Sequence, residues 1–368
     1  MHIFITGGTG LIGRQLCKAL LAEGHELTVL SRNPASVAVK CGVAVHALHS
    51  LAEWQPAQTF DAIINLAGEP IVDERWTESR KKALWDSRVT LTEELVRRIA
   101  AAEHKPAVLL SGSAVGYYGN RGDAMLDETA SAGEGFAAEL CKAWEDAARV
   151  AEAVGLRPRH GAAEPTGAGV AASHLLPQTA DFVGNVSKVR PRHGAAEPTG
   201  AGVAASHLLP QTADFVGNVS KVRVCLLRTS PVLSNDGGML GKMLPAFKLG
   251  LGARLGDGKQ WMSWVHMQDY VAMVLRLLRD PHTSGPYNMA APQPVTNAEF
   301  TATLAAALHR PALFSAPAAL LKLAMGERAS LLLEGQRALP RKMEMLHHRF
   351  AFASLAEALD DLLVRGAQ

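Results

Sequence analysis

A glycine-rich run near the N-terminus, Thr6–Gly13 (TGGTGLIG), constrains the fold more than any other feature of the chain. The apolar residues before it are typical of a strand, and those after it have the spacing of a helix. Gly7 permits a tight turn, Gly10 allows a ligand to approach the backbone, and Gly13 allows the helix to pack closely on the strand. This order predicts an α/β fold in which the helix N-terminus binds the phosphates of a dinucleotide.

The end of the second predicted strand, residues 26–30, indicates which dinucleotide is bound. Ser31 and Arg32 follow this strand, where a fold that binds NAD usually has a carboxylate for the ribose 2′-hydroxyl. A hydroxyl and a permanently charged guanidinium suit a 2′-phosphate instead. NADP is therefore the predicted cofactor and NAD the less favoured one. The structural alternative is that Arg32 only covers the adenine face.

Two later strand-like segments, residues 61–65 and 107–111, end in small and polar residues. The carboxyl ends of parallel strands meet at one edge of a sheet, so these ends are expected to border the same ligand crevice. The predicted cofactor-binding residues come from the glycine turn and from the residues that follow the strand-like segments 26–30 and 61–65. They are Gly7, Thr9, Gly10, Leu11, Ile12, Gly13, Ser31, Arg32, Leu66, Ala67, Gly68 and Glu69.

Together, these segments resemble an atypical extended short-chain dehydrogenase/reductase family, the epimerase family (NAD-dependent epimerase/dehydratase-like). Residues 68–88, 258–270 and 287–300 look like the same group, and residues 331–343 are similar to its C-terminal domain of unknown function. The resemblance implies a Rossmann-type, doubly wound parallel sheet with a small, mostly helical C-terminal substrate domain. It also implies an NADP-binding oxidoreductase or epimerase that acts on a small polar substrate, such as a sugar nucleotide or a carbonyl compound.

The catalytic pattern of the resembled family is incomplete in this chain. Typical members combine a Ser or Thr after the fifth strand with a Tyr-x-x-x-Lys pair on the next helix, and Ser113 fits the first position. Aligning Glu145 with the glutamate that often follows the pair places Ala137 and Cys141 where Tyr and Lys are expected. Lys142 comes one residue late, about 100° around a helix. The usual pair is therefore predicted to be missing.

Two hypotheses follow for the activity. In the first, Tyr117 or Tyr118 supplies the phenol and Ser113 assists, which makes an oxidoreductase or epimerase with a rearranged site. In the second, the chain binds NADP without turnover and acts as a sensor or regulatory protein, a role that some members of the resembled family are given in cell division. Packing is the structural alternative for both tyrosines.

Four residues are predicted to contact the substrate. Arg75 and Arg88 would bind a charged substrate, with a solvated helix face as the structural alternative. Trp264 and His266 fall at the edge of the substrate region, with a buried core histidine as the alternative for His266. Asp269 and Asn297 are predicted to cap helices.

The chain contains an identical tandem repeat, because residues 157–189 recur without change at 190–222. Solenoid repeats diverge, so perfect identity indicates a recent duplication or inserted element. We expect the repeat to lie in a helix-to-strand connection, loosely structured and away from the ligand edge of the sheet. The alternative is that it forms a recognition arm.

The sequence predicts four parts of the chain. They are the first part of the dinucleotide-binding domain (1–156), the repeat (157–222), the rest of the Rossmann domain with the start of the substrate region (223–291), and a helical C-terminal domain (292–368).

Composition and residue pattern disfavour several classes of binding partner. The net charge of +2 over 368 residues disfavours a nucleic-acid binder, and no apolar run reaches the ~18–20 residues that cross a bilayer. The cysteines and histidines do not have metal-ligand spacing, so no metal is expected. The N-terminus does not have the pattern of a signal peptide. We therefore expect a cytoplasmic monomer or homodimer whose partner is a small-molecule substrate.

Overall fold

Seven parallel strands form the central sheet of the computed structural model, which describes residues 1–154 and 221–364. The strand order is β12-β7-β5-β4-β1-β2-β3, so the chain runs outward in both directions from β1. This is the doubly wound arrangement, and the predicted Rossmann-type fold is confirmed. The strands are β1 (His2–Thr6), β2 (Glu26–Leu30), β3 (His46–Leu48), β4 (Ala62–Asn65), β5 (Val108–Ala114), β7 (Arg223–Thr229) and β12 (Gly285–Met289).

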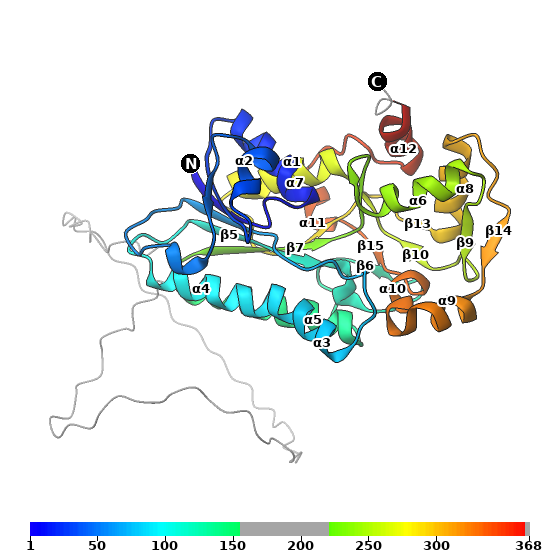
Figure 1. Cartoon of the computed structure of the whole chain (residues 1–368), viewed down its shortest axis with the longest axis horizontal. Helices are drawn as coiled ribbons and strands as arrows, with labels where there is room; N and C mark the ends of the chain where they lie inside the picture. The colour runs from blue at the N-terminus through cyan, green and yellow to red at the C-terminus, as the bar shows by residue number, and fades with distance from the viewer. Residues whose placement is uncertain (155–220, 365–368) are drawn as a thin grey trace, which may run out of the picture. The chain divides into compact units, whose positions relative to one another are not determined.

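Helices cover both faces of this sheet, with α1, α2 and α7 on one face and α4 and α5 on the other (Figure 1). Alternate residues of each strand supply the two cores. In β1, Ile3 and Ile5 belong to one apolar cluster and Phe4 to the other, as the period of two in a strand requires. The covering helices are α1 (Leu11–Ala22), α2 (Ala35–Cys41), α4 (Leu91–Ala101), α5 (Phe136–Arg149) and α7 (Met267–Arg279).

The turn between β1 and α1 depends on backbone approaches that side chains would block. Gly7 has a φ of 71°, and a Cβ there would lie 2.6 Å from the carbonyl carbon of Leu66. A Cβ on Gly13 would lie 2.3 Å from the carbonyl oxygen of Gly7. The glycines therefore bring the turn against the end of β4 and the first helix against the turn, as expected from their spacing.

A separate apolar cluster supports the C-terminal region, where α6, α8 and α12 pack around Trp264 and Phe300. This region is mostly helical, as predicted. Its helices are α6 (Gly238–Lys248), α8 (Asn297–Ala307), α9 (Ala318–Met325), α10 (Ser330–Leu333), α11 (Arg341–Met345) and α12 (Leu355–Val364). Short two-stranded sheets accompany them: β10 (Trp261–Met262) with β13 (Val295–Thr296), β11 (Val265–His266) with β8 (Val232–Ser234), β14 (Phe314–Ala316) with β9 (Ala253–Leu255), and β15 (Arg337–Ala338) with β6 (Met125–Leu126).

The two predicted helix caps are wrong. The side chain of His266, not Asp269, caps α7, because Nδ1 of His266 accepts a hydrogen bond from the N–H of Gln268 (3.1 Å). Thr296, not Asn297, caps α8 and forms a reciprocal capping box with Glu299. Asp269 instead accepts hydrogen bonds from the N–H groups of the chain entering α12.

The described residues belong to one compact unit. Their first part ends after a 3₁₀ turn, Val150–Ala153, and their second part begins shortly before β7. The predicted repeat at 157–222 falls almost entirely outside the described residues, so its expected structure and position stay a prediction. The four predicted domain boundaries likewise stay predictions.

Substitution Gly13→Ala is expected to destabilise the protein by about 1–3 kcal/mol, the usual cost of overpacking. The added methyl group meets backbone of the turn, which cannot move aside as a side chain can. The measurement is the free energy of unfolding in urea. Gly241→Ala in α6 is the control, because its Cβ would meet no atom within 4 Å. Equal stability of the two variants would contradict the proposed packing.

Candidate functional site

The N-terminus of α1 is open. Gly10 is the N-cap residue and no side chain caps it, while its own N–H donates to the carbonyl of Gly7 (3.0 Å). A Cβ on Gly10 would meet only that carbonyl oxygen, at 3.2 Å, so the approach to the first turn is clear. The N–H groups of Leu11 and Ile12 begin the helix, where backbone donors lack intrahelical partners. Such an end binds phosphate oxygens, so the residues present fit a pyrophosphate.

A buried polar network holds this turn against the end of β4. The hydroxyl of Thr6 donates to Oδ1 of Asn65 (2.6 Å), and the N–H of Ala67 donates back to that hydroxyl (3.1 Å). Nδ2 of Asn65 donates to the hydroxyls of Thr92 (2.8 Å) and Ser111 (3.2 Å). The network thus aligns the carboxyl ends of β1, β4 and β5, where the strand order reverses and open α/β sheets bind ligands.

Residues 68–69 are held by a π-helical turn between α3 (Glu78–Trp85) and α4. The N–H of Glu69 donates to the hydroxyl of Ser87 (3.1 Å), and the guanidinium of Arg88 donates to the carbonyl of Glu69 (2.9 Å). A Cβ on Gly68 would lie 2.9 Å from Cζ of Arg88. Arg88 is half-buried beside Trp144, and this burial lowers its pKa. The structure therefore places Arg88 under the loop after β4, where it supports that loop.

Arg32 extends from the end of β2 to Glu69 on the loop after β4. Its guanidinium lies 2.7 Å from Oε1 of Glu69, and Arg80 lies 3.7 Å from Oε2. The side chain of Arg32 is 90% exposed, so this ion pair is solvated and weak. It bridges two loops that flank the end of β1. Ser31, one residue earlier, is buried at the same edge.

The hydroxyl of Ser113 is engaged by a buried ion pair. It donates to Oε1 of Glu145 (2.8 Å), whose carboxylate also accepts two hydrogen bonds from Arg228 (2.8 and 2.9 Å). All three side chains are at most 3% exposed. The pair joins α5 to β7 and completes a bidentate geometry that favours both charges.

Tyr118 belongs to the same buried network. Its hydroxyl donates to Oδ1 of Asn288 (2.7 Å) and accepts a hydrogen bond from Arg228 (3.0 Å). Burial raises the pKa of Tyr118 to about 12. The main-chain N–H of Asn288 in turn donates to the carboxylate of Glu128 (3.1 Å), and burial raises the pKa of Glu128. The phenol of Tyr118 is thus a structural link between the loop after β5 and β12.

Tyr117 differs from its neighbour, because within the part of the chain that the structure describes its hydroxyl has no hydrogen bond. Its ring is half-buried and lies 3.6 Å from Cζ of Arg228, which holds the ring by cation–π stacking. Lys142 on α5 is paired with Asp146 (2.6 Å). This hydrogen bond and the charge of Asp146 raise the pKa of Lys142, and Tyr117 adds to the rise.

The two helix positions assigned by alignment to Tyr and Lys face the loop that carries Tyr117. A Cβ on Gly116 would lie 3.7 Å from Cβ of Ala137 and 3.8 Å from Sγ of Cys141. Cys141 is buried, and its burial raises the thiol pKa to about 11. The thiol is therefore protonated at neutral pH.

Of the other residues predicted to contact the substrate, Arg75 lies at the surface, and Trp264 and His266 lie in the C-terminal core. Arg75 is exposed and donates to the carbonyl of Ala324 at the end of α9 (2.9 Å). Trp264 is fully buried, with its indole N–H donating to the carbonyl of Gln293 (2.9 Å). His266 is 4% exposed and stacks on Phe352 with ring centroids 3.9 Å apart. The polar atoms of Trp264 and His266 thus serve the C-terminal core.

Sequence reasoning missed the residues that build the network around Ser113. They are Glu128, Glu145, Arg228 and Asn288, of which only Glu145 was noted, as an alignment marker. One signal was present, because Arg228 directly follows the apolar run 224–227 and so requires an anion if it is buried. In the described residues, no group of three or more potential metal ligands occurs. No described helix combines the length and apolarity needed to cross a membrane.

Two family models match the sequence of this chain. The sequence model of the NAD dependent epimerase/dehydratase family matches residues 3–182 and 212–290, and that of a domain of unknown function, DUF1731, matches residues 316–362. The unmatched residues 183–211 lie inside the tandem repeat.

Similar proteins span nearly the whole chain. Epimerase family protein Mb2239 of Mycobacterium bovis is 35% identical over 361 residues, covering 97% of this chain and 96% of that protein. Epimerase family protein YfhF of Bacillus subtilis is 30% identical over 365 residues, with 99% and 98% covered. The crystal structure of human epimerase family protein SDR39U1 (isoform 2) with NADPH is 30% identical, with 98% and 99% covered and a TM-score of 0.73.

Substitution Glu145→Gln is expected to destabilise the fold by about 3–5 kcal/mol, because it leaves the charge of Arg228 buried without a counter-ion. The measurement is the free energy of unfolding in urea. Asp146→Asn is the matched control on the same helix, since its pair with Lys142 is exposed and worth about 0.5 kcal/mol. A loss below 1 kcal/mol for Glu145→Gln would show that the buried pair does not hold the network.

Proposed function

The chain belongs to the NAD dependent epimerase/dehydratase family, and we propose that it binds NADP(H) across the turn between β1 and α1. The observation that carries the proposal is the uncapped N-terminus of α1 at the reversal of strand order, with Gly10 leaving the approach clear. The human relative was crystallised with NADPH, which supports the phosphorylated coenzyme. The N–H groups of Leu11 and Ile12 would bind the pyrophosphate. Residues Leu66–Glu69 would line the crevice opposite.

Ser31 and Arg32 support NADP(H) over NAD(H), because they offer a hydroxyl and a cation at the end of β2. Glu69 is the partner of the Arg32 guanidinium, at 2.7 Å. A 2′-phosphate would replace this carboxylate as the partner of Arg32. The exchange favours the phosphate, because the dianion attracts the guanidinium more strongly than one carboxylate does.

For turnover, we propose that Tyr117 is the group that exchanges a proton with a small polar substrate, such as a carbonyl compound or a sugar nucleotide. A bound nicotinamide would supply or accept the hydride. Arg228 fixes the ring of Tyr117 at 3.6 Å, and Lys142 lies within electrostatic reach of it. The exposed Arg75 is the predicted substrate cation whose side chain reaches solvent. This assigns Ser113 and Tyr118 to positioning rather than to proton transfer.

A second function, a non-catalytic NADP(H)-binding sensor or regulatory protein, has its own support. The hydroxyls of Ser113 and Tyr118 donate to buried partners, and Ala137 and Cys141 occupy the helix positions beside the loop. In this case the coenzyme would act as a ligand whose binding alters the protein, and Tyr117 would be a packing residue.

The proposal also includes a cytoplasmic location and a monomer or homodimer. All four cysteines are free and buried, which suits a reducing compartment.

Substitution Arg32→Gln is expected to weaken NADPH binding about tenfold and to leave NADH binding within about twofold, because only NADPH carries the 2′-phosphate. Isothermal titration calorimetry of the full chain with each coenzyme measures this. Equal weakening of both coenzymes would contradict the assignment of Arg32 to the phosphate.

Substitution Tyr117→Phe distinguishes the two functions. If Tyr117 exchanges the proton, loss of its hydroxyl lowers the rate of NADPH oxidation with a responsive carbonyl or sugar-nucleotide substrate by about 10²–10⁴-fold, the usual contribution of general acid catalysis. Coenzyme affinity stays unchanged, which serves as the internal control. Tight NADPH binding without turnover on a substrate panel, and no effect of the substitution, would favour the sensor.

A further inference from the structure

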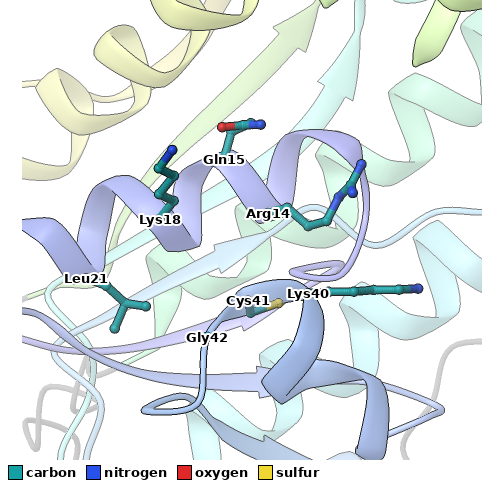
Figure 2. A pocket seen from close by; sticks show the side chains of 7 residues that line it. All are labelled: Arg14, Gln15, Lys18, Leu21, Lys40, Cys41 and Gly42. Carbon is teal, nitrogen blue, oxygen red and sulfur yellow. The ribbon is translucent and has the colours of Figure 1, made fainter. Parts of the chain in front are cut away.

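A hollow of about 460 Å³ lies between α1 and α2 (Figure 2). Three of its lining side chains are cationic, and the lining contains no carboxylate. The lining residues are Arg14, Gln15, Lys18, Leu21, Lys40, Cys41 and Gly42.

The positive charge of this hollow is not compensated. Arg14, Lys18 and Lys40 form no ion pair within the described ranges 1–154 and 221–364, whereas Arg32 at the end of β2 is paired with Glu69. Nε of Arg14 is buried and has no hydrogen-bond partner in the described structure. A buried donor without a partner is costly, and such groups are rare in native proteins. An anionic ligand in the hollow would satisfy both the charge and the donor.

The hollow adjoins the phosphate-binding turn on the side of β2. Arg14 directly follows Gly13, and its main-chain N–H donates to the carbonyl of Gly10 (3.0 Å). Sγ of Cys41, at the end of α2, donates to the carbonyl of Gly8 (3.3 Å). A Cβ on Gly8 would lie 2.9 Å from the side chain of Val29 in β2. The cations therefore stand beside the strand that ends in Ser31 and Arg32.

We propose that this hollow receives the 2′-phosphate of NADP(H), with Arg14 and Lys40 as its ligands in addition to Arg32. The side chains of Arg14 and Lys40 extend toward the same side of the hollow, while Lys18 and Leu21 lie further along α1 (Figure 2). A phosphomonoester matches this site, because it carries up to two negative charges and three acceptor oxygens. The guanidinium supplies forked donors and the ammonium a compact charge. This inference rests on the proposed binding of NADP(H).

The test is calorimetric titration of wild-type protein and of Arg14→Gln and Lys40→Gln with NADPH and with NADH. Each substitution is expected to weaken NADPH binding about tenfold and to change NADH binding by less than twofold. Arg97→Gln on α4 is the control, because it removes an exposed cation from the other face of the sheet, away from the hollow. Its expected change is below twofold for both coenzymes. Equal melting temperatures of all four proteins exclude a loss of folding.

Inorganic phosphate distinguishes the source of the phosphate group. If the 2′-phosphate occupies the hollow, inorganic phosphate at millimolar concentration competes with NADPH in the wild type and no longer does so in Arg14→Gln. Phosphate binding that leaves NADPH affinity unchanged would overturn the inference in favour of a separate anion site.

Other outcomes also separate the two proposals. NADPH binding that is unaffected by Arg14→Gln and Lys40→Gln, but weakened by Arg32→Gln, would overturn the inference and leave the proposed function standing. Equal weakening of NADPH and NADH would place the cations at the pyrophosphate and overturn it as well. If wild-type protein binds neither coenzyme, the proposed function fails, and the inference fails with it.

Discussion

The buried ion pair between Glu145 and Arg228 is the interaction on which the ligand edge of the sheet depends. Neither charge reaches water, so each requires the other and both require the surrounding donors and acceptors. This pair fixes the positions of α5 and β7 relative to each other. β5 is joined to them, because Ser113 on β5 donates to the same carboxylate and β5 pairs with β7. The guanidinium also contacts Tyr117 and Tyr118, so the position of the loop after β5 follows from the same charge.

This constraint explains why two adjacent tyrosines have different chemistry. The phenol of Tyr118 points into the network and is shared between Arg228 and Asn288, so its hydroxyl is a structural hydrogen-bonding group. The ring of Tyr117 packs on the same guanidinium, 3.6 Å from its Cζ atom. One cation thus orients both rings, but among the described residues only the hydroxyl of Tyr118 takes part in hydrogen bonds.

Local features of the sequence predicted the fold well. The glycine turn, the ends of β2 and β4 and the alternation of helices and strands depend on residues close together in the chain. The network around Ser113 was not predicted, because Glu145 and Arg228 are 83 residues apart and meet only through the strand order. The cap of α8 was missed although Thr296 and Glu299 have the spacing of a capping box. The cap of α7 was harder to predict from the sequence, because His266 is an uncommon N-cap residue.

The order of strands in the sheet has a consequence for synthesis of the chain. β5 pairs with β7 along its whole length, yet the residues between Ala114 and Arg223 must leave the ribosome first. At roughly 5–20 residues per second, the backbone N–H and C=O groups on this edge of β5 stay unpaired for roughly 5–20 s. An unpaired apolar strand is a template for pairing with other chains. In a nascent polypeptide of this topology this edge therefore stays open to other chains until β7 is made, and every residue added between the two strands prolongs that exposure.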